Sequence, residues 1–153
     1  MRKLSQQTPH VTFEFKGAAS CSAIGIITSL TNGIQIPQGT IVARGQVEGA
    51  NGVVEQFELI AGQDTAEWAF RFPTIQNLVQ HQSPHQVFRS WTVQQPDKTF
   101  AVAQNYLKRL QLQTPVIPVK LSITLVTSPG VPADLLLDID RVIFYTTEAK
   151  GQK

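Results

Sequence analysis

Apolar and polar residues alternate along much of the chain with the two-residue period of a β-strand that buries one face. Residues 10–16 show this most clearly, because Val11, Phe13 and Phe15 fall on one face and polar residues on the other. The stretch at 100–112 is ambiguous, and we expect a strand to about Asn105 followed by a loop or a short helix. Further strand-like stretches occupy residues 21–30, 40–48, 53–60, 87–93, 116–126 and 134–146.

Turn residues separate these stretches. Asn32-Gly33 and the run at 49–52 contain Asn-Gly pairs that tolerate positive φ, so residues 40–60 are expected to form a hairpin. About eight or nine short strands with almost no helical period predict an all-β fold, and we expect an antiparallel two-sheet β-sandwich with jelly-roll topology. We expect a flexible lead at 1–9, one sandwich domain at 10–148 and a flexible tail at 149–153.

The segment from Gly62 to Trp91 interrupts this regular pattern. It contains both tryptophans of the chain and two of its three histidines. Within it, Trp68–Phe72 alternates like a short strand, and residues 74–80 have the spacing of one short helical turn. We expect specific chemistry to occur where this central segment meets the sheets.

The low content of charged residues limits the kinds of partner that we expect for this chain. Charged residues make up 16% of the chain, below the roughly 25% of ordinary soluble domains, and the formal net charge is only +2. We therefore expect neither nucleic acid nor an anionic membrane surface as a partner, and the basic pairs Arg2-Lys3 and Lys108-Arg109 are interpreted as solvated. No stretch approaches the roughly 20 apolar residues of a spanning helix, so direct membrane insertion is not expected. The single cysteine, Cys21, lies in a strand-like run and is interpreted as a buried thiol.

Two pairs of residues raise the question of a metal site. His81 and His85 are four residues apart, but Pro84 between them disfavours the helix that would place both on one face. Asp138 and Asp140 lie two apart on a strand and share a face, where their oxygens would suit a structural calcium ion. The alternative for these aspartates is a solvated or salt-bridged position beside Arg141. We predict no cofactor, with Asp138 and Asp140 as the candidates for a structural calcium ion.

Catalytic motifs are scarce. Asp64 and Glu67 are the one pair of nearby acids in the central segment that suits glycoside hydrolysis. Asp64 with Thr65 also has the pattern of a local turn or cap, which is the interpretation we favour. We predict no enzyme activity and no catalytic residue.

The tryptophans indicate a binding site. Flat aromatic rings contact the C–H faces of sugars, while polar neighbours supply directional hydrogen bonds. The competing interpretation is that both tryptophans belong to the core. The candidate ligand-binding residues are Asp64, Trp68, Arg71, His81, His85, Arg89 and Trp91.

The closing unit, VKLSITLVTSPGVPADLLLDIDRVIFY, joins a long strand, a Pro-Gly turn and a last strand. With the whole strand plan, it resembles the galactose-binding-like jelly-roll sandwiches, which include many carbohydrate-binding modules. The segments TAEWAFRFP and QHQSPHQVFRSW are similar to accessory domains of uncharacterised bacterial membrane proteins. That resemblance implies an extracytoplasmic location if the chain belongs to a membrane-anchored protein, and a cytoplasmic one otherwise.

Three functional hypotheses follow, in this order. The first is a non-catalytic carbohydrate-binding module, which would be an accessory domain of a larger protein. The second is a structural or protein-interaction domain without a sugar ligand. The third is a glycoside hydrolase. The partner is therefore expected to be a carbohydrate or a protein, and the sequence does not indicate an oligomeric state.

Overall fold

The computed structural model describes residues 2–146, which form nine β-strands and no helix. The tail expected at 149–153 lies outside the described residues. The strands are β1 (Arg2–Leu4), β2 (His10–Glu14), β3 (Cys21–Thr31), β4 (Ile41–Gly49), β5 (Val54–Ile60), β6 (Val87–Gln94), β7 (Phe100–Val116), β8 (Pro118–Leu125) and β9 (Leu136–Thr146).

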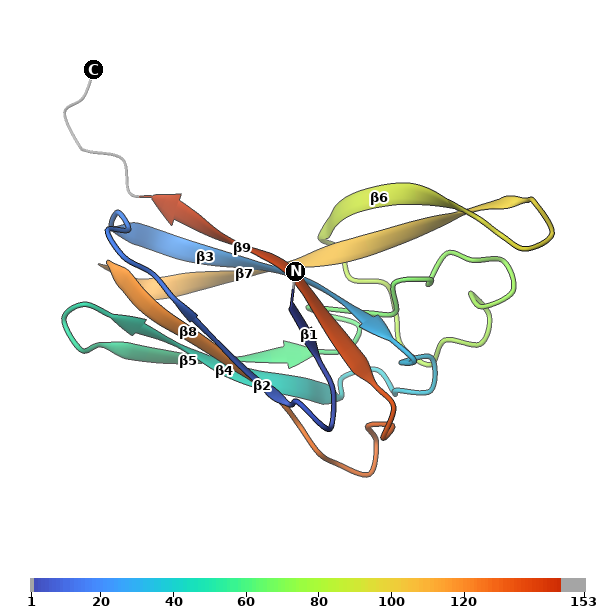
Figure 1. Ribbon diagram of the computed structural model, residues 1–153, viewed down its shortest axis with the longest axis horizontal. Helices are drawn as coiled ribbons and strands as arrows, with labels where there is room; N and C mark the ends of the chain where they lie inside the picture. Colours follow the sequence, from blue (N-terminus) through green and yellow to red (C-terminus); the bar gives the residue numbers. More distant parts are fainter. Residues whose placement is uncertain (1, 147–153) are drawn as a thin grey trace, which may run out of the picture.

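Two antiparallel sheets pack face to face (Figure 1). One has the strand order β1-β9-β3-β7-β6, and the other has the order β2-β8-β4-β5. Their facing sides bury one apolar core, which includes Ile24 and Ile26 of β3, Leu121 and Ile123 of β8, and Leu137 of β9. The two-sheet antiparallel sandwich predicted from the alternation is confirmed. Cys21 is fully buried in this core, as expected, and burial raises the pKa of its thiol.

The turns between strands follow the local sequence. Asn32 has a φ of 64° in the turn after β3, and Gly52 has a φ of 82° in the β4–β5 hairpin. Both are positions where the turn needs a residue that tolerates the left-handed region. The hairpin predicted at 40–60 is confirmed by the register of β4 against β5, for example Gln46 opposite Gln56.

Two expectations about strand extent are wrong. The strand expected to end near Asn105 continues through Val116 as β7, because β7 changes partner along its length. Its first half pairs with β6 and its second half with β3, with Tyr106 at the junction. The lead at 1–9 contains β1, which pairs with β9 and buries Leu4 at 2% exposure, so this part of it belongs to the sheet.

The central segment enters the five-stranded sheet where β3 and β7 diverge. Leu30 of β3 donates its N–H to the Ala66 carbonyl and accepts from the Trp68 N–H, at 2.8 and 2.9 Å. On the other side, the Gln104 N–H of β7 donates to the Trp68 carbonyl at 3.1 Å. Residues 66–68 therefore fill the gap between two strands that no longer pair with each other.

Beyond residue 68 the segment folds into turns. The strand expected at Trp68–Phe72 does not form, because the N–H groups of Phe70 and Phe72 bond carbonyls three residues back. Residues 73–78 form consecutive turns, and the Gln76 N–H donates to the Phe72 carbonyl at 2.8 Å, a single bond of helical spacing. The spacing near 74–80 thus produces a series of turns with one hydrogen bond of helical spacing, and no helix.

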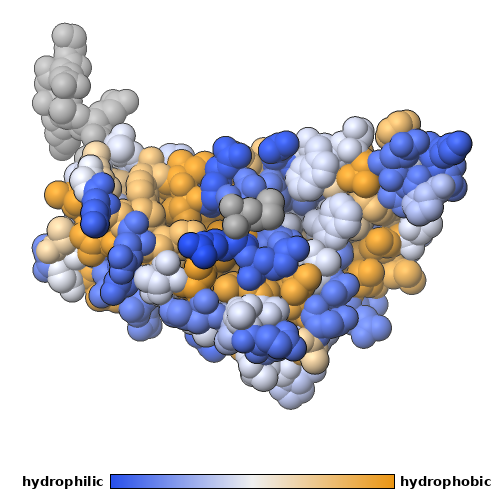
Figure 2. All heavy atoms as spheres, in the orientation of Figure 1, coloured by the Kyte–Doolittle hydropathy of each residue, from blue (hydrophilic) through white to orange (hydrophobic). Residues whose placement is uncertain are grey.

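The β6–β7 hairpin extends beyond the other strands of the two sheets, and in the view of Figure 1 it lies above the central segment. Its inner side chains join a second, smaller apolar cluster of Ala69, Phe72, Ala101 and Ala103. Figure 2 shows apolar side chains reaching the surface at this end of the molecule. Within the described residues, no helix has the length and apolar character needed to span a membrane.

Candidate functional site

A hollow of about 440 Å³ opens on the outer face of the five-stranded sheet, and we call it the outer hollow. Every strand of that sheet contributes to it, together with the central segment. Strand alternation places its residues, since Ser29 and Thr31 of β3 flank the buried Leu30 and therefore point outward. The lining residues are Lys3, Ser29, Thr31, Trp68, Arg89, Trp91, Asn105, Asp138 and Asp140.

Both tryptophans line this hollow, and both are half-buried. The Trp68 ring packs edge-on against Phe72, with ring centroids 5.2 Å apart. Trp91 on β6 lies beneath the guanidinium of Arg89, which is 5.8 Å from the ring centroid. Both indoles also pack against the second apolar cluster. Each indole therefore packs against the hairpin on one side and forms a wall of the hollow on the other. The tryptophans thus have features of both interpretations, as part of an apolar cluster and as part of a candidate binding site.

Two acceptor oxygens in the hollow have no hydrogen-bond donor among the described residues. They are Oδ1 of Asn105, a residue only 6% exposed, and Oδ1 of Asp138. The other carboxylate oxygen of Asp138 accepts from the Thr31 hydroxyl at 3.2 Å. The Lys3 ammonium lies 3.6 Å from Asp138 Oδ1, which makes an ion pair at a distance longer than a hydrogen bond. Both oxygens are buried among the residues that line the hollow, so the fold leaves their hydrogen-bonding capacity unused there.

A buried polar network lies next to the hollow and fixes the central segment. The Tyr106 hydroxyl donates to the Glu67 carbonyl at 2.9 Å and accepts from the Gln104 amide at 2.9 Å. The Glu67 carboxylate accepts from the Gly33 N–H at 2.8 Å. Burial raises the pKa of Tyr106 to about 12, so the hydroxyl stays protonated and keeps its donor. The network holds Trp68, the next residue, at the edge of the hollow.

Glu67 is the most perturbed acid of the described chain that bears on the site. Burial at 3% exposure raises its pKa to about 7, and the negative charge of Asp138 adds to the rise, while the Gly33 hydrogen bond opposes it. The carboxyl is thus a structural group, and its ionisation in the folded protein is unfavourable because the charge would be buried.

His81 is also structural. Its Nε2 accepts from the Glu67 N–H at 3.1 Å, so Nδ1 carries the proton and donates to the Ile36 carbonyl at 2.9 Å. Burial lowers the pKa of His81, and the bond to Ile36 opposes that shift. The imidazole has no nitrogen left for a ligand or a metal, so its selection as a ligand-binding residue is corrected.

The remaining candidates from the sequence divide clearly. Trp68, Arg89 and Trp91 meet in the outer hollow, and Asp138 and Asp140 join them there. Arg71 and His85 are exposed and do not line it. Asp64 caps a turn instead, because its Oδ2 accepts from the Ile60 N–H at 2.9 Å and its Oδ1 pairs with Lys108 at 3.1 Å. The turn interpretation of Asp64 is confirmed.

The geometry gives no support to a hydrolytic pair or a metal centre. Asp64 and Glu67 are both buried, and each carboxylate accepts a hydrogen bond from a backbone N–H, that of Ile60 for Asp64 and that of Gly33 for Glu67. His81 is buried while His85 is exposed, so they form no pair. Across residues 2–146, no group of three or more His, Cys, Asp or Glu side chains is arranged to hold a metal ion.

Sequence reasoning missed four residues of the hollow: Lys3, Ser29, Thr31 and Asn105. Lys3 was interpreted as solvated, yet it pairs with Asp138. Lys108, interpreted in the same way, pairs with Asp64. Alternation along residues 21–31 could have placed Ser29 and Thr31 on the outer face, but no local signal connects them to residues 68, 105 or 138.

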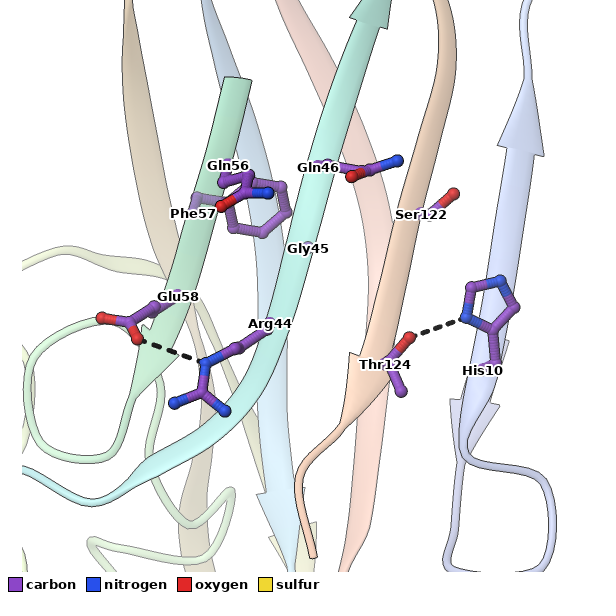
Figure 3. A pocket seen from close by; sticks show the side chains of 9 residues that line it. All are labelled: His10, Arg44, Gly45, Gln46, Gln56, Phe57, Glu58, Ser122 and Thr124. Carbon is purple, nitrogen blue, oxygen red and sulfur yellow. Dashed lines mark hydrogen bonds and ion pairs between the residues drawn. The ribbon is translucent and has the colours of Figure 1, made fainter. Parts of the chain in front are cut away.

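A second hollow lies on the outer face of the four-stranded sheet (Figure 3). Four of its polar side chains bond in pairs: Arg44 pairs with Glu58 at 3.4 Å, and the His10 ring bonds Thr124 at 2.7 Å. The aromatic residue lining it, Phe57, is 6% exposed and belongs to the core. We therefore place the candidate site in the outer hollow, which combines two half-exposed indoles with unpartnered oxygens.

In comparisons with known proteins, no protein-family model, no curated protein and no solved structure matches this chain. The function is therefore inferred from the side chains of the hollow and their surroundings.

Proposed function

We propose that this chain is a non-catalytic carbohydrate-binding module that holds its ligand in the outer hollow. The observation that carries the proposal is that Trp68 and Trp91 line one hollow with Asn105 and Asp138, whose Oδ1 atoms accept no hydrogen bond from the described residues. An indole face offers apolar contact to the C–H groups of a sugar ring, and a free acceptor oxygen takes a hydrogen bond from a hydroxyl. A volume of about 440 Å³ lies within the range of small-ligand sites.

The strand order supports the resemblance to galactose-binding-like sandwiches. Without β6, the sheets contain β1-β9-β3-β7 and β2-β8-β4-β5, so the chain crosses repeatedly between them, as in jelly-roll proteins. We include in the proposal the jelly-roll assignment and a role as an accessory domain of a larger protein.

A protein-interaction domain is the second candidate, and the exposed apolar side chains near the hairpin favour it. Phe100 is 68% exposed, Leu78 is 58% exposed and Phe88 is 36% exposed. Exposed large apolar side chains contribute to contact surfaces in many proteins. This hypothesis predicts a protein partner on the hairpin and no glycan in the outer hollow.

Acrylamide quenching of tryptophan fluorescence, measured with each of a panel of soluble glycans, tests the carbohydrate-binding proposal against the protein-interaction alternative. We expect partial quenching in the free protein, since both indoles are half-buried, and protection by at least one glycan. Trp91→Ala is expected to weaken binding of that glycan at least tenfold, or about 1.4 kcal/mol, because the stacking surface is lost.

Two matched controls accompany this variant. Phe100→Ala removes a more exposed aromatic ring from the same hairpin, outside the hollow, and should leave glycan affinity unchanged. Arg71→Gln should likewise have no effect, whereas Arg89→Gln should weaken binding. If no glycan protects either tryptophan, or if Trp91→Ala binds as the wild type does, the carbohydrate proposal is wrong.

A further inference from the structure

The outer hollow is lined by two carboxylates, Asp138 and Asp140, and by two cationic side chains, Lys3 and Arg89. Asp138 and Asp140 point outward from β9, on either side of the buried Ile139, and Asn105 lies on β7. Oδ1 of Asn105 and Oδ1 of Asp138 are buried and receive no hydrogen bond from the described residues. A desolvated carboxylate oxygen without a donor is unfavourable, and a positively charged donor offsets it better than a neutral one. The part of the hollow around Asp138 therefore favours a positively charged group.

The chain itself places an ammonium there. Lys3 Nζ lies 3.6 Å from Asp138 Oδ1, but the Lys3 side chain is 56% exposed and Asp138 only 17%. At that distance and exposure the lysine is a weak partner that can move away into solvent. An ammonium group on a ligand can take the same place and approach the oxygen more closely.

The surroundings are compatible with such a group. Indole faces attract cations, and Arg89 already lies over Trp91 at 5.8 Å. The field of Asp138 reaches the neighbouring carboxyl of Glu67, where it adds to the effect of burial in raising the pKa. A divalent metal suits this part of the hollow less well, because Asp140 Oδ2 already accepts from Arg141 Nε at 3.0 Å and leaves few charged oxygens.

We propose that the sugar bound in the outer hollow carries a free amino group, as a 2-amino-2-deoxy sugar does. This inference rests on the proposed carbohydrate function. Its ammonium takes the place of Lys3 beside Oδ1 of Asp138, while the pyranose ring contacts Trp68 and Trp91.

The test compares three β-1,4-linked oligosaccharides of equal length: glucosamine, N-acetylglucosamine and glucose oligomers. Binding is measured by calorimetry on the intact chain at pH 6, where the amine is charged. We expect the glucosamine oligomer to bind at least tenfold more tightly than the other two. Asp138→Asn should remove that preference, because the negative charge is lost while the shape is kept.

Lys3→Ala provides a second variant that is safe for folding, since the side chain is mostly exposed. Without the competing ammonium, affinity for the glucosamine oligomer should rise severalfold, and affinity for the glucose oligomer should not change. Lys16→Ala, which removes an exposed lysine outside the hollow, is the matched control and should change neither affinity.

The outcomes separate the inference from the proposed function. If the three oligomers bind equally, the amino-sugar inference is wrong and the carbohydrate function stands. If none of the three binds and the wider glycan panel is also negative, both are wrong. If a simple diamine such as putrescine binds as tightly as the glucosamine oligomer, the sugar ring is not recognised and the inference is again overturned.

Discussion

Between pH 4.5 and pH 8, the stability advantage of Glu67→Gln over the wild type is expected to grow by about 3 kcal/mol. The ordinary pKa of this carboxyl is 4.5 and its folded-state pKa is about 7. Each pKa unit corresponds to about 1.4 kcal/mol. Because Glu67 is 3% exposed, solvent screens this effect little.

The direction of the change follows from proton linkage. Above pH 4.5 the unfolded chain releases the Glu67 proton, whereas the folded protein keeps it until the pH exceeds about 7. The folded state therefore binds more protons in this window, and the free energy of unfolding of the wild type falls as the pH rises. Glutamine does not titrate, so the variant lacks this loss.

Urea denaturation of both proteins at several pH values measures the effect. Other groups titrate in the same range, above all His81, whose pKa burial lowers. The difference between variant and wild type removes their contribution as long as they respond equally in both proteins. Glu14→Gln, at an exposed position on β2, is the matched control and should show no such trend. If the difference in the free energy of unfolding between Glu67→Gln and the wild type stays constant from pH 4.5 to 8, the Glu67 carboxyl does not have a raised pKa in the folded protein.

Leu30→Ala is expected to lower the free energy of unfolding by about 2 to 5 kcal/mol. Leu30 is fully buried in the main core at the point where β3 leaves β7. The substitution removes buried methyl groups and leaves a cavity beside the residues that hold the central segment. The loss should appear as a lower urea midpoint at an unchanged slope.

The same variant should loosen the wall of the hollow. The Leu30 carbonyl accepts from the Trp68 N–H, so hydrogen exchange at the Trp68 amide should become faster. Leu78→Ala is the matched control, because Leu78 is 58% exposed and its truncation should change stability by no more than about 0.5 kcal/mol. Equal losses in the two variants would show that this junction is not part of the cooperative core.

Much of the fold could be predicted because its causes are local. Alternation at 10–16 and 53–60 and the Asn-Gly turns are properties of neighbouring residues, and they produced β2, β5 and the β4–β5 hairpin. The prediction failed where a distant partner decides the structure. Residues 106–116 extend as β7 because β3 pairs with them. Beyond Trp68 the central segment turns, because the N–H groups of Phe70 and Phe72 bond carbonyls of the segment itself and not of a neighbouring strand.

The candidate site shows the same division. Residue type alone selected Trp68, Arg89, Trp91, Asp138 and Asp140, and the structure brings these five together. Residue type also selected His81 and Asp64, whose hydrogen-bonding atoms are used by the backbone. A sequence does not show whether a polar side chain is free or already bonded.

By itself, the sequence determined an antiparallel two-sheet sandwich and the aromatic segment at which its pattern breaks. Both are encoded in residue type and short-range spacing. Only the tertiary structure decided that Lys3, Ser29, Asn105 and Asp138 surround the same hollow as the two tryptophans. Those residues come from four strands far apart in the chain, and their proximity follows from strand pairing, which depends on the packing of the whole core.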